Sequence, residues 1–427
     1  MSNFKIVITT IFAICIIAGI VVFALSKSSS SQQSSNLVIW GTISPEAFNI
    51  AYKNSSLSSN KLIKIAYIKK DQATFESDFV EALAEGIGPD MVILRDDTLY
   101  KQRNKLFVMP YKNYSERNFK DRFIQEGEIF LSSDGVVAVP FIIDPMVMYW
   151  NRDLFSNNLI SAPPKYWDEI YPIIDKITQR DSSANILQSA IAFGEWNNIT
   201  SAKEIIAMIL LQAGTPITAR NSSGVISVLN SQFKYPIAPS SSGINFYTQF
   251  SNPTAGAYTW NRSLPSSFNF FLSGNLAMYI GFASEIFSIQ QKNSNLNFDV
   301  TTVPQIRNAP KKVVFAHMYS ISIVKQSKQI AGAFVALNAL TEGSAIKSLE
   351  NVTNLPPVRR DLLADKPIDA FRTVFYDSAL ISDSWIDPDP VASSNTFRDM
   401  IESITSGQSR VSEALSRAND ELNAELK

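Results

Sequence analysis

Strand-like and helix-like patterns alternate over residues 37–94, and this alternation constrains the fold more than any other feature of the chain. Three short apolar runs have the length of interior strands: Leu37–Trp40, Leu62–Ile68 and Met91–Leu94. Between them, Ser44 followed by Pro45 marks the start of one helix, and an apolar stripe beginning at Phe75 marks a second. Strands that alternate with helices through short connections predict an α/β fold with a parallel, doubly wound sheet.

A second apolar stretch, Phe268–Ser284, predicts a helix end, a tight turn and a buried strand. The turn is expected at residues 273–275, a Ser-Gly-Asn cluster of the kind that ends helices. The strand is expected at 276–282, where Gly281 allows the backbone to turn sharply or to approach a ligand closely. Ligands of open α/β proteins bind past the carboxyl ends of strands, so the loop that follows is a candidate site.

Length, charge and cysteine content narrow the class of protein. A chain of 427 residues is too long for one compact core, so two lobes are expected. A net charge of −1 gives no basic excess, so nucleic acid is not an expected partner. Cys15 is the only cysteine, and it lies in the amino-terminal segment. The rest of the chain therefore has no disulfide, no thiolate metal site and no cysteine nucleophile.

Residues 1–26 are predicted to be a membrane anchor or an export signal, and residues 27–36 a Ser- and Gln-rich linker. Ile6–Leu25 carries no charge and is long enough to cross a bilayer as one transmembrane helix. A retained anchor is favoured because this run is longer than the usual signal core. A signal cleaved near Ala24-Leu25-Ser26 and a lipoprotein acylated at Cys15 are the alternatives. All three export the rest of the chain.

The sequence lacks the familiar machinery of hydrolases. His317 is the only histidine, and a structural or lining role is favoured over that of a base. No nucleophile elbow, zinc-protease motif or phosphate-binding loop occurs. Asp96 and Asp97 are adjacent, and on an extended chain their side chains point to opposite sides, which argues against a glycosidase pair. We expect a binding protein, not an enzyme, with no catalytic residue, no metal and no cofactor.

The exported part resembles the extracellular solute-binding proteins of family 1, the maltose-binding-protein-like group that serves ABC importers. The similarity covers nearly all of residues 37–427 and is carried by five pieces in order. They are Leu37–Gly41, Gly88–Leu94, Ala138–Phe155, Phe268–Ser284 and the carboxyl-terminal helix after Ser406-Gly407. The resemblance implies a periplasmic-binding-protein-like fold, in which two α/β lobes joined by crossing strands close over a solute at a hinge.

By the same resemblance, lobe 1 comprises residues 37–143 and 319–366, and lobe 2 comprises residues 145–316 and 367–427. The matching positions imply these ligand-binding residues: Thr42, Glu46, Asp96, Asp97, Asp144, Gly281, Phe282 and Ser284. Ser284 stands where the maltose-binding pattern has a stacking tryptophan. This departure argues against a maltodextrin ligand and leaves other sugars open.

Sugar recognition needs flat apolar faces for stacking and polar groups for paired hydroxyls. Trp196 and Asn197 lie in a polar, loop-like segment and are candidates for such contacts, and so are Trp260 and Trp385. Packing at the rim or in the core is the alternative for each tryptophan. Core packing is favoured outright for the tryptophans at 40, 150 and 167.

The leading hypothesis is an extracytoplasmic solute-binding receptor of an ABC importer, most simply for a carbohydrate. Its expected partners are a small polar solute, the transmembrane subunits of an ABC permease and the membrane, through the amino-terminal helix. The protein is expected to be a monomer on the outer face of the cell membrane or in the periplasm. The alternative is a membrane-anchored sensor or adhesion module with the same fold and no transporter.

Overall fold

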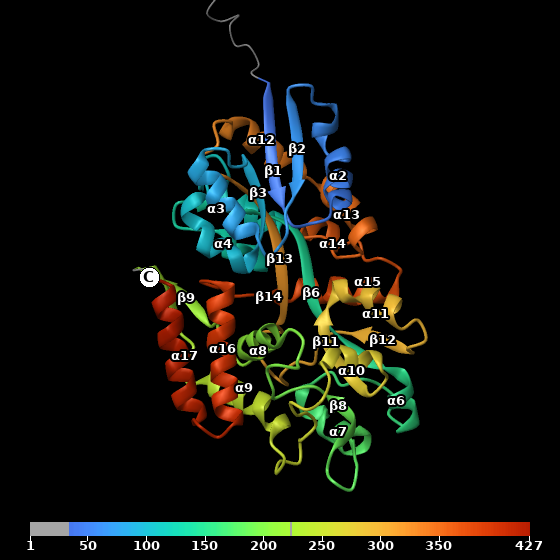
Figure 1. Cartoon of the computed structure of the whole chain (residues 1–427). Coiled ribbons are helices and arrows are strands. Elements are labelled where there is room, and N and C mark those ends of the chain that lie inside the picture. The colour runs from blue at the N-terminus through green and yellow to red at the C-terminus, as the bar shows by residue number, and fades with distance from the viewer. Residues whose placement is uncertain (1–33, 223) are drawn as a thin grey trace, which may run out of the picture.

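The computed structural model describes residues 34–222 and 224–427, and among these residues ten strands form one mixed sheet (Figure 1). The strands in sheet order are β2 (Ile63–Lys69), β1 (Ser35–Gly41), β3 (Met91–Arg95), β13 (Val314–Ile323), β6 (Val139–Asn151), β11 (Leu276–Phe282), β8 (Ile186–Ile191) and β7 (Gln179–Arg180). β12 (Phe298–Thr301) pairs with β6, and β14 (Ser382–Asp383) pairs with β13. Two small two-stranded antiparallel sheets are β4 (Met109–Pro110) with β5 (Gly135–Val136), and β9 (Thr218–Asn221) with β10 (Gly224–Ser227).

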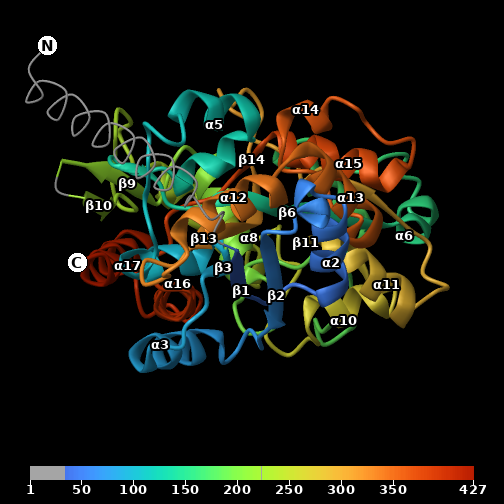
Figure 2. The same cartoon turned by 90° about the horizontal axis from the view of Figure 1, so that it is seen from above.

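The alternation over residues 37–94 folds as predicted. β1 pairs in parallel with both β2 and β3. Most apolar side chains of β1 and all of those of β3 are buried because helices cover both faces of these strands. α2 (Pro45–Lys53) packs with α13 (Gly343–Thr353) on one side of the strands, and α3 (Phe75–Glu85) lies on the other (Figure 2).

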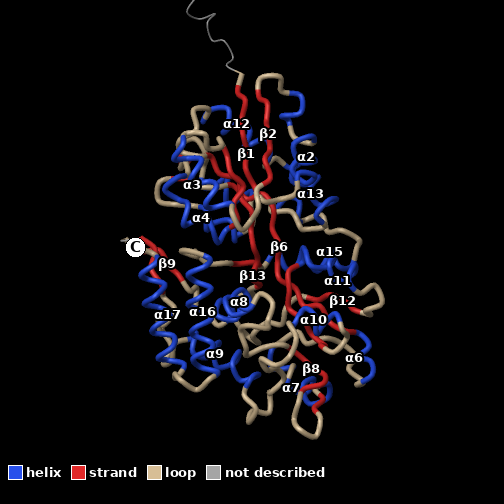
Figure 3. Tube along the Cα trace, viewed as in Figure 1, coloured by secondary structure: helices blue, strands red, loops and turns tan. Residues whose placement is uncertain are grey.

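β6 and β13 are the long strands that run through the centre of the molecule (Figure 3). We call the part around β1, β2 and β3 lobe 1, and the part around β8 and β11 lobe 2. The two long strands are antiparallel and place His317 directly opposite Asp144. Asp144 and His317 lie between the lobe boundaries that the resemblance implies, at 143–145 and 316–319, and these boundaries stay a prediction.

The remaining helices cover the two lobes (Figure 1). They are α4 (Asp96–Gln102), α5 (Glu116–Arg122), α6 (Arg152–Asn157), α7 (Tyr171–Ile177), α8 (Ala202–Gln212), α9 (Pro239–Thr248), α10 (Ser267–Leu272), α11 (Ile286–Lys292), α12 (Ile330–Leu340), α14 (Arg360–Leu363), α15 (Ala370–Leu380), α16 (Pro390–Thr405) and α17 (Val411–Glu425). In lobe 2, α16 packs against α17 and α8, and α17 packs against α9. The last two helices therefore bring the carboxyl-terminal part of the chain beside α8.

Local signals set several helix starts. The Ser44 hydroxyl accepts a hydrogen bond from the Ala47 N–H at the start of α2, and Ser266 caps α10 in the same way. By contrast, the expectation that Asp96 and Asp97 lie on an extended chain is wrong, because β3 ends at Arg95 and α4 begins at the next residue. A helix N-terminus favours carboxylates in its first turn, which accounts for the acidic pair.

The predicted anchor and linker of residues 1–33 lie outside the described residues. Within residues 34–222 and 224–427, no helix combines the length and apolar character needed to cross a membrane.

Phe268–Ser284 forms α10, a turn and β11, as predicted. Gly281, however, lies inside β11 and is buried, so its small size serves packing within lobe 2. A Cβ there would lie 2.6 Å from Tyr279 Cε1 and 2.8 Å from Glu285 Oε1. These two side chains are joined by a 2.5 Å hydrogen bond from the Tyr279 hydroxyl to Glu285 Oε2, and the missing side chain makes room for it.

Replacing Gly281 by alanine should lower the free energy of unfolding by about 1–3 kcal/mol, because the added methyl overpacks this site. Denaturant unfolding followed by circular dichroism measures the change. Gly256→Ala is the matched control, since nothing lies within 4 Å of its added Cβ, and a change within about 0.5 kcal/mol is expected there. Equal stabilities for the two variants would contradict the packing role of Gly281.

Candidate functional site

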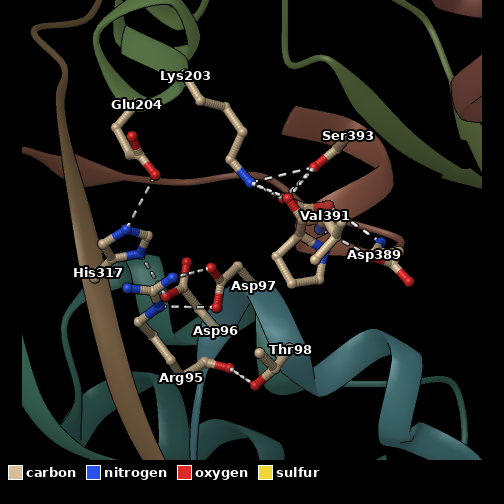
Figure 4. Close-up of polar contacts among 12 residues, drawn as sticks. Arg95, Asp96, Asp97, Thr98, Lys203, Glu204, His317, Asp389, Val391 and Ser393 are labelled. Carbon is tan, nitrogen blue, oxygen red and sulfur yellow. Dashed lines mark hydrogen bonds and ion pairs between the residues drawn. The ribbon is translucent and has the colours of Figure 1, made fainter. Parts of the chain in front are cut away.

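Charged side chains from both lobes meet where α4, α8, β13 and the start of α16 approach one another (Figure 4). On the lobe 1 side, Arg95 ends β3 and donates two hydrogen bonds to Asp97, the one from Nε being 2.9 Å long. Burial opposes ionisation of Asp97, but the charge and hydrogen bonds of Arg95 prevail and lower its pKa to about 2. The two form an ion pair whose geometry is fixed by the first turn of α4.

His317 lies between carboxylates of the two lobes (Figure 4). Its Nδ1 is 3.1 Å from Asp96 Oδ1 in lobe 1, and its Nε2 is 3.5 Å from Glu204 Oε1 in α8 of lobe 2. Burial lowers the pKa of His317, but Asp96 and Glu204 prevail and raise it to about 10. The imidazole is therefore a cation at neutral pH.

Lys203 supplies the second buried cation, on the first turn of α8. Its Nζ donates to Asp387 at 2.7 Å, to Ser393 at 3.2 Å and to the carbonyl of Pro390 at 3.3 Å. Although burial lowers the pKa of Lys203, Asp387 and Glu204 raise it overall. This pair holds the start of α16 against α8. The nearby Asp389 caps α16 by accepting the N–H groups of residues 391 and 392.

A cavity of about 380 Å³ opens between these groups. It is lined by Arg95 and Asp97 of lobe 1 and by Trp196, Asn197, Ile199, Ser201, Ala202, Lys203, Glu204, Pro390 and Ser394 of lobe 2. A smaller cavity of about 220 Å³ adjoins it, sharing Arg95 and Pro390, and Thr42 lies in its wall. The cavity wall thus combines one indole with an arginine–carboxylate pair, a lysine and a second carboxylate, which suits a small polar molecule with an apolar face.

The structure brings three of the residues singled out from sequence into the larger cavity: Asp97, Trp196 and Asn197. Trp196 is half-buried, and the Asn197 side chain donates to Glu402 of α16 at 2.7 Å. Thr42 lies in the adjoining cavity.

A second group of predicted residues lies where the paired strands β6 and β13 pass between the lobes. The Ser284 N–H donates to Asp144 Oδ1 at 3.0 Å, and burial raises the pKa of Asp144. Phe282 stacks on the ring of His317 with centroids 4.9 Å apart, and Asp96 accepts the N–H of Met318 at 3.1 Å. These residues, with Gly281 inside β11, support the hinge side of the site.

Three predicted residues lie elsewhere. Glu46 is exposed on the first turn of α2 and lines neither of the two cavities described above. Trp260 is fully buried, packs on Phe270 and donates its indole N–H to Asn198. Trp385 is 3% exposed and packs on Phe397. Burial of both tryptophans does not fit the predicted stacking on a ligand, because their faces are covered by other side chains.

Sequence reasoning missed Arg95, Lys203 and Glu204. Arg95 adjoins the predicted Asp96–Asp97 pair, and this adjacency was the available signal. Lys203 and Glu204 lie in the first turn of α8, a helix rich in apolar residues, but no local pattern shows which way the start of that helix faces. Among the described residues, no group of three or more histidine, cysteine, aspartate or glutamate side chains is arranged to hold a metal ion.

The imidazole of His317 should remain protonated well above pH 6.5, its ordinary pKa, and lose its proton near pH 10. Its contribution to stability is then complete below about pH 6.5 and is lost as the pH rises through about 10. Because the chain has one histidine, its ring signals in a proton–nitrogen NMR titration are unambiguous.

The charged and titratable groups around His317 are Arg95, Asp96, Asp97, Glu126, Asp144 and Glu204. Asp96→Asn tests the cause, because removing one carboxylate should move the pKa of His317 down toward 6.5. Titration of the unaltered folded protein near pH 6.5 would contradict the ion-pair assignment.

Solved structures share this fold over almost the whole chain. A cyclo/maltodextrin-binding protein complexed with maltotetraose is similar with a TM-score of 0.75 and 16% identity, covering 93% of this chain and 99% of that one. A solute-binding protein of an ABC transporter from Thermotoga lettingae, bound to α-D-tagatose, has a TM-score of 0.63 and 19% identity, covering 92% and 100%. A cyclic α-maltosyl-1,6-maltose binding protein from Arthrobacter globiformis has a TM-score of 0.74 and 14% identity, covering 92% and 99%.

At these identities the likeness establishes the two-lobed solute-binding fold. The family comes from the sequence itself, because residues 46–373, about three quarters of the chain, match the model of the bacterial extracellular solute-binding proteins. The members of this family are binding proteins that act outside the cytoplasm. The chain belongs to the bacterial extracellular solute-binding proteins.

Proposed function

We propose that this protein is the extracytoplasmic receptor of an ABC importer and that it binds a small carbohydrate between its two lobes. The observation that carries the proposal is the composition of the 380 Å³ cavity. One aromatic face, Trp196, lies in the same wall as the Arg95–Asp97 pair and Glu204. An indole packs against the apolar face of a sugar ring, while charged planar groups bond its hydroxyls.

The free atoms of these groups fit hydroxyl recognition. Arg95 uses Nε and Nη2 for Asp97, and its Nη1 has no hydrogen-bond partner among residues 34–222 and 224–427. Glu204 directs Oε1 toward His317, which leaves Oε2 to accept from a solute. Lys203 is committed to Asp387, Ser393 and Pro390, so it shapes the cavity wall and supplies positive potential.

The three similar structures bind maltotetraose, α-D-tagatose and cyclic α-maltosyl-1,6-maltose, and this range supports the carbohydrate class without selecting one sugar. The single indole in the cavity favours one stacked ring over a long maltodextrin. Ser284 agrees with this preference, because it offers no aromatic face where the maltose-binding pattern has a tryptophan. We infer a mono- or short oligosaccharide.

An anchor within residues 1–26 would hold the receptor at the membrane, and closure of the lobes over the solute would produce the form that a permease recognises. The anchor, the permease and the solute are parts of this proposal.

A thermal-shift screen of the full-length chain in mild detergent tests the solute class, because a ligand bound only by the folded protein raises its Tm. D-tagatose, maltose, maltotetraose, spermidine and a short peptide form the panel. A rise in Tm with at least one sugar is expected. Stabilisation by spermidine or the peptide, with none by a sugar, would contradict the carbohydrate assignment.

Trp196→Ala should weaken binding of the stabilising sugar by roughly five- to thirtyfold, because an aromatic contact contributes about 1–2 kcal/mol. Isothermal titration calorimetry measures the change in Kd. Phe287→Ala is the matched control: this exposed aromatic lies on α11 and lines neither cavity. Unchanged affinity in Trp196→Ala would show that the indole does not contact the bound sugar.

A further inference from the structure

His317 lies at the point where the paired strands β6 and β13 pass from one lobe to the other. It lies on β13 directly opposite Asp144 of β6 and is 5% exposed. Its two ring nitrogens face carboxylates that belong to different lobes, Asp96 in α4 and Glu204 in α8 (Figure 4). One side chain at the hinge therefore contacts charged groups of both lobes.

The imidazole is fixed in orientation and in protonation. Phe282 stacks on one face with an interplanar angle of 22°, and Phe315 meets the ring edge-on with centroids 5.2 Å apart. A neutral imidazole has a single N–H and would leave a lone pair directed at one of the two carboxylates. The imidazolium donates from Nδ1 to Asp96 and also points an N–H at Glu204, 3.5 Å away, so the bridge requires the charged form.

The two bridged carboxylates differ in their surroundings. Asp96 is buried against lobe 1, where its Oδ1 also accepts the Met318 N–H. Glu204 lines the cavity between the lobes. Separation of α4 from α8 would break at least one of the two contacts of His317, because the ring cannot follow both carboxylates.

We propose that His317 is a positioning residue that holds the Glu204 carboxylate at the solute cavity and, through Asp96, ties that position to the closed arrangement of the lobes. The contact of Glu204 with solute rests on the proposed function, whereas the link between the lobes does not. Solute would then bind to a carboxylate that is already oriented when the lobes close, which lowers the cost of ordering it.

A second ion pair between the lobes provides an internal comparison. Lys101 of α4 contacts Asp389 at the start of α16, with Nζ and Oδ2 2.5 Å apart. The Lys101 side chain is 33% exposed and also contacts Glu76 of its own lobe. Partly exposed pairs contribute little because water and salt compete for both charges, so this pair should matter less to closure than the buried bridge.

A distance measurement between the lobes tests the link without any solute. Cys15→Ser removes the only native cysteine from the full-length chain. Glu81→Cys in α3 and Ser416→Cys in α17, both at exposed positions, then carry spin labels for pulsed electron–electron dipolar spectroscopy in detergent. The parent should show a short inter-lobe distance. In His317→Ala the ratio of open to closed populations should rise roughly tenfold, the effect of losing one charge-assisted hydrogen bond.

Two further variants keep the test decisive if His317→Ala does not fold. Glu204→Gln removes the charge of the lobe 2 partner while keeping its shape and should open the lobes in the same way. Lys101→Gln should change the ratio less than threefold. An unchanged distance distribution in His317→Ala or Glu204→Gln, a parent without the short distance, or equal opening in Lys101→Gln would overturn the assignment.

Calorimetry with the sugar that stabilises the parent tests the positioning role. His317→Gln, which keeps a side-chain N–H but loses the charge, should weaken Kd by roughly tenfold, with His317→Ala weaker still. Unchanged affinity in both variants would overturn the positioning role. If no sugar binds the parent, the proposed function fails, and the distance measurement still decides whether His317 links the lobes.

Discussion

The pairing of β6 with β13 is the constraint on which the rest of the structure depends. These strands belong to both lobes, and their apolar side chains are buried along most of their length. β3 pairs with the carboxyl-terminal half of β13, so α4, which follows β3 without a connecting loop, begins beside it. Gln212 at the end of α8 donates to the carbonyl of Val313 at 2.8 Å, which aligns α8 with the other half. The site therefore lies where α4, which is aligned with one half of β13, approaches α8, which is aligned with the other half.

Burial of so many charges at this junction is costly unless each has an opposite charge in good geometry. Arg95 with Asp97, and Lys203 with Asp387, satisfy that condition within their own lobes, so each lobe keeps its pair when the lobes separate. His317 differs because its two partners lie in different lobes. Opening of the lobes would therefore break a contact of this buried cation, while the two ion pairs stay fixed in the cavity wall.

The sequence was informative wherever the signal was local. Apolar runs and capping serines predicted the strands of lobe 1, α2 and the α10–β11 unit, because helix caps and strand periods depend on near neighbours. Trp196 was found for a related reason, because it lies in a polar, loop-like segment, whereas Asp97 was found through its matching position in the resembling family. The resemblance to a known family supplied the expected assignment of residue ranges to the two lobes.

Tertiary packing accounts for what the sequence could not show. Lys203 pairs with Asp387, 184 residues later, and neither neighbourhood contains a sign of the other. Trp260 lies in a polar local sequence yet is buried, since Asn198, 62 residues earlier, accepts its indole N–H and satisfies the one polar group that would otherwise oppose burial. Stacking candidates chosen by local polarity fail when a distant side chain supplies such a partner.

The one histidine shows how environment decides chemistry. A general base must be unprotonated at the working pH, with a pKa near neutrality. His317 is enclosed by Asp96 and Glu204, which raise its pKa to about 10, and its ring is held by Phe282 and Phe315. At neutral pH it has no lone pair to offer a substrate, so its geometry suits a fixed cation. That role requires the same two carboxylates to remain in place, and they do so only when both lobes are correctly joined at β6 and β13.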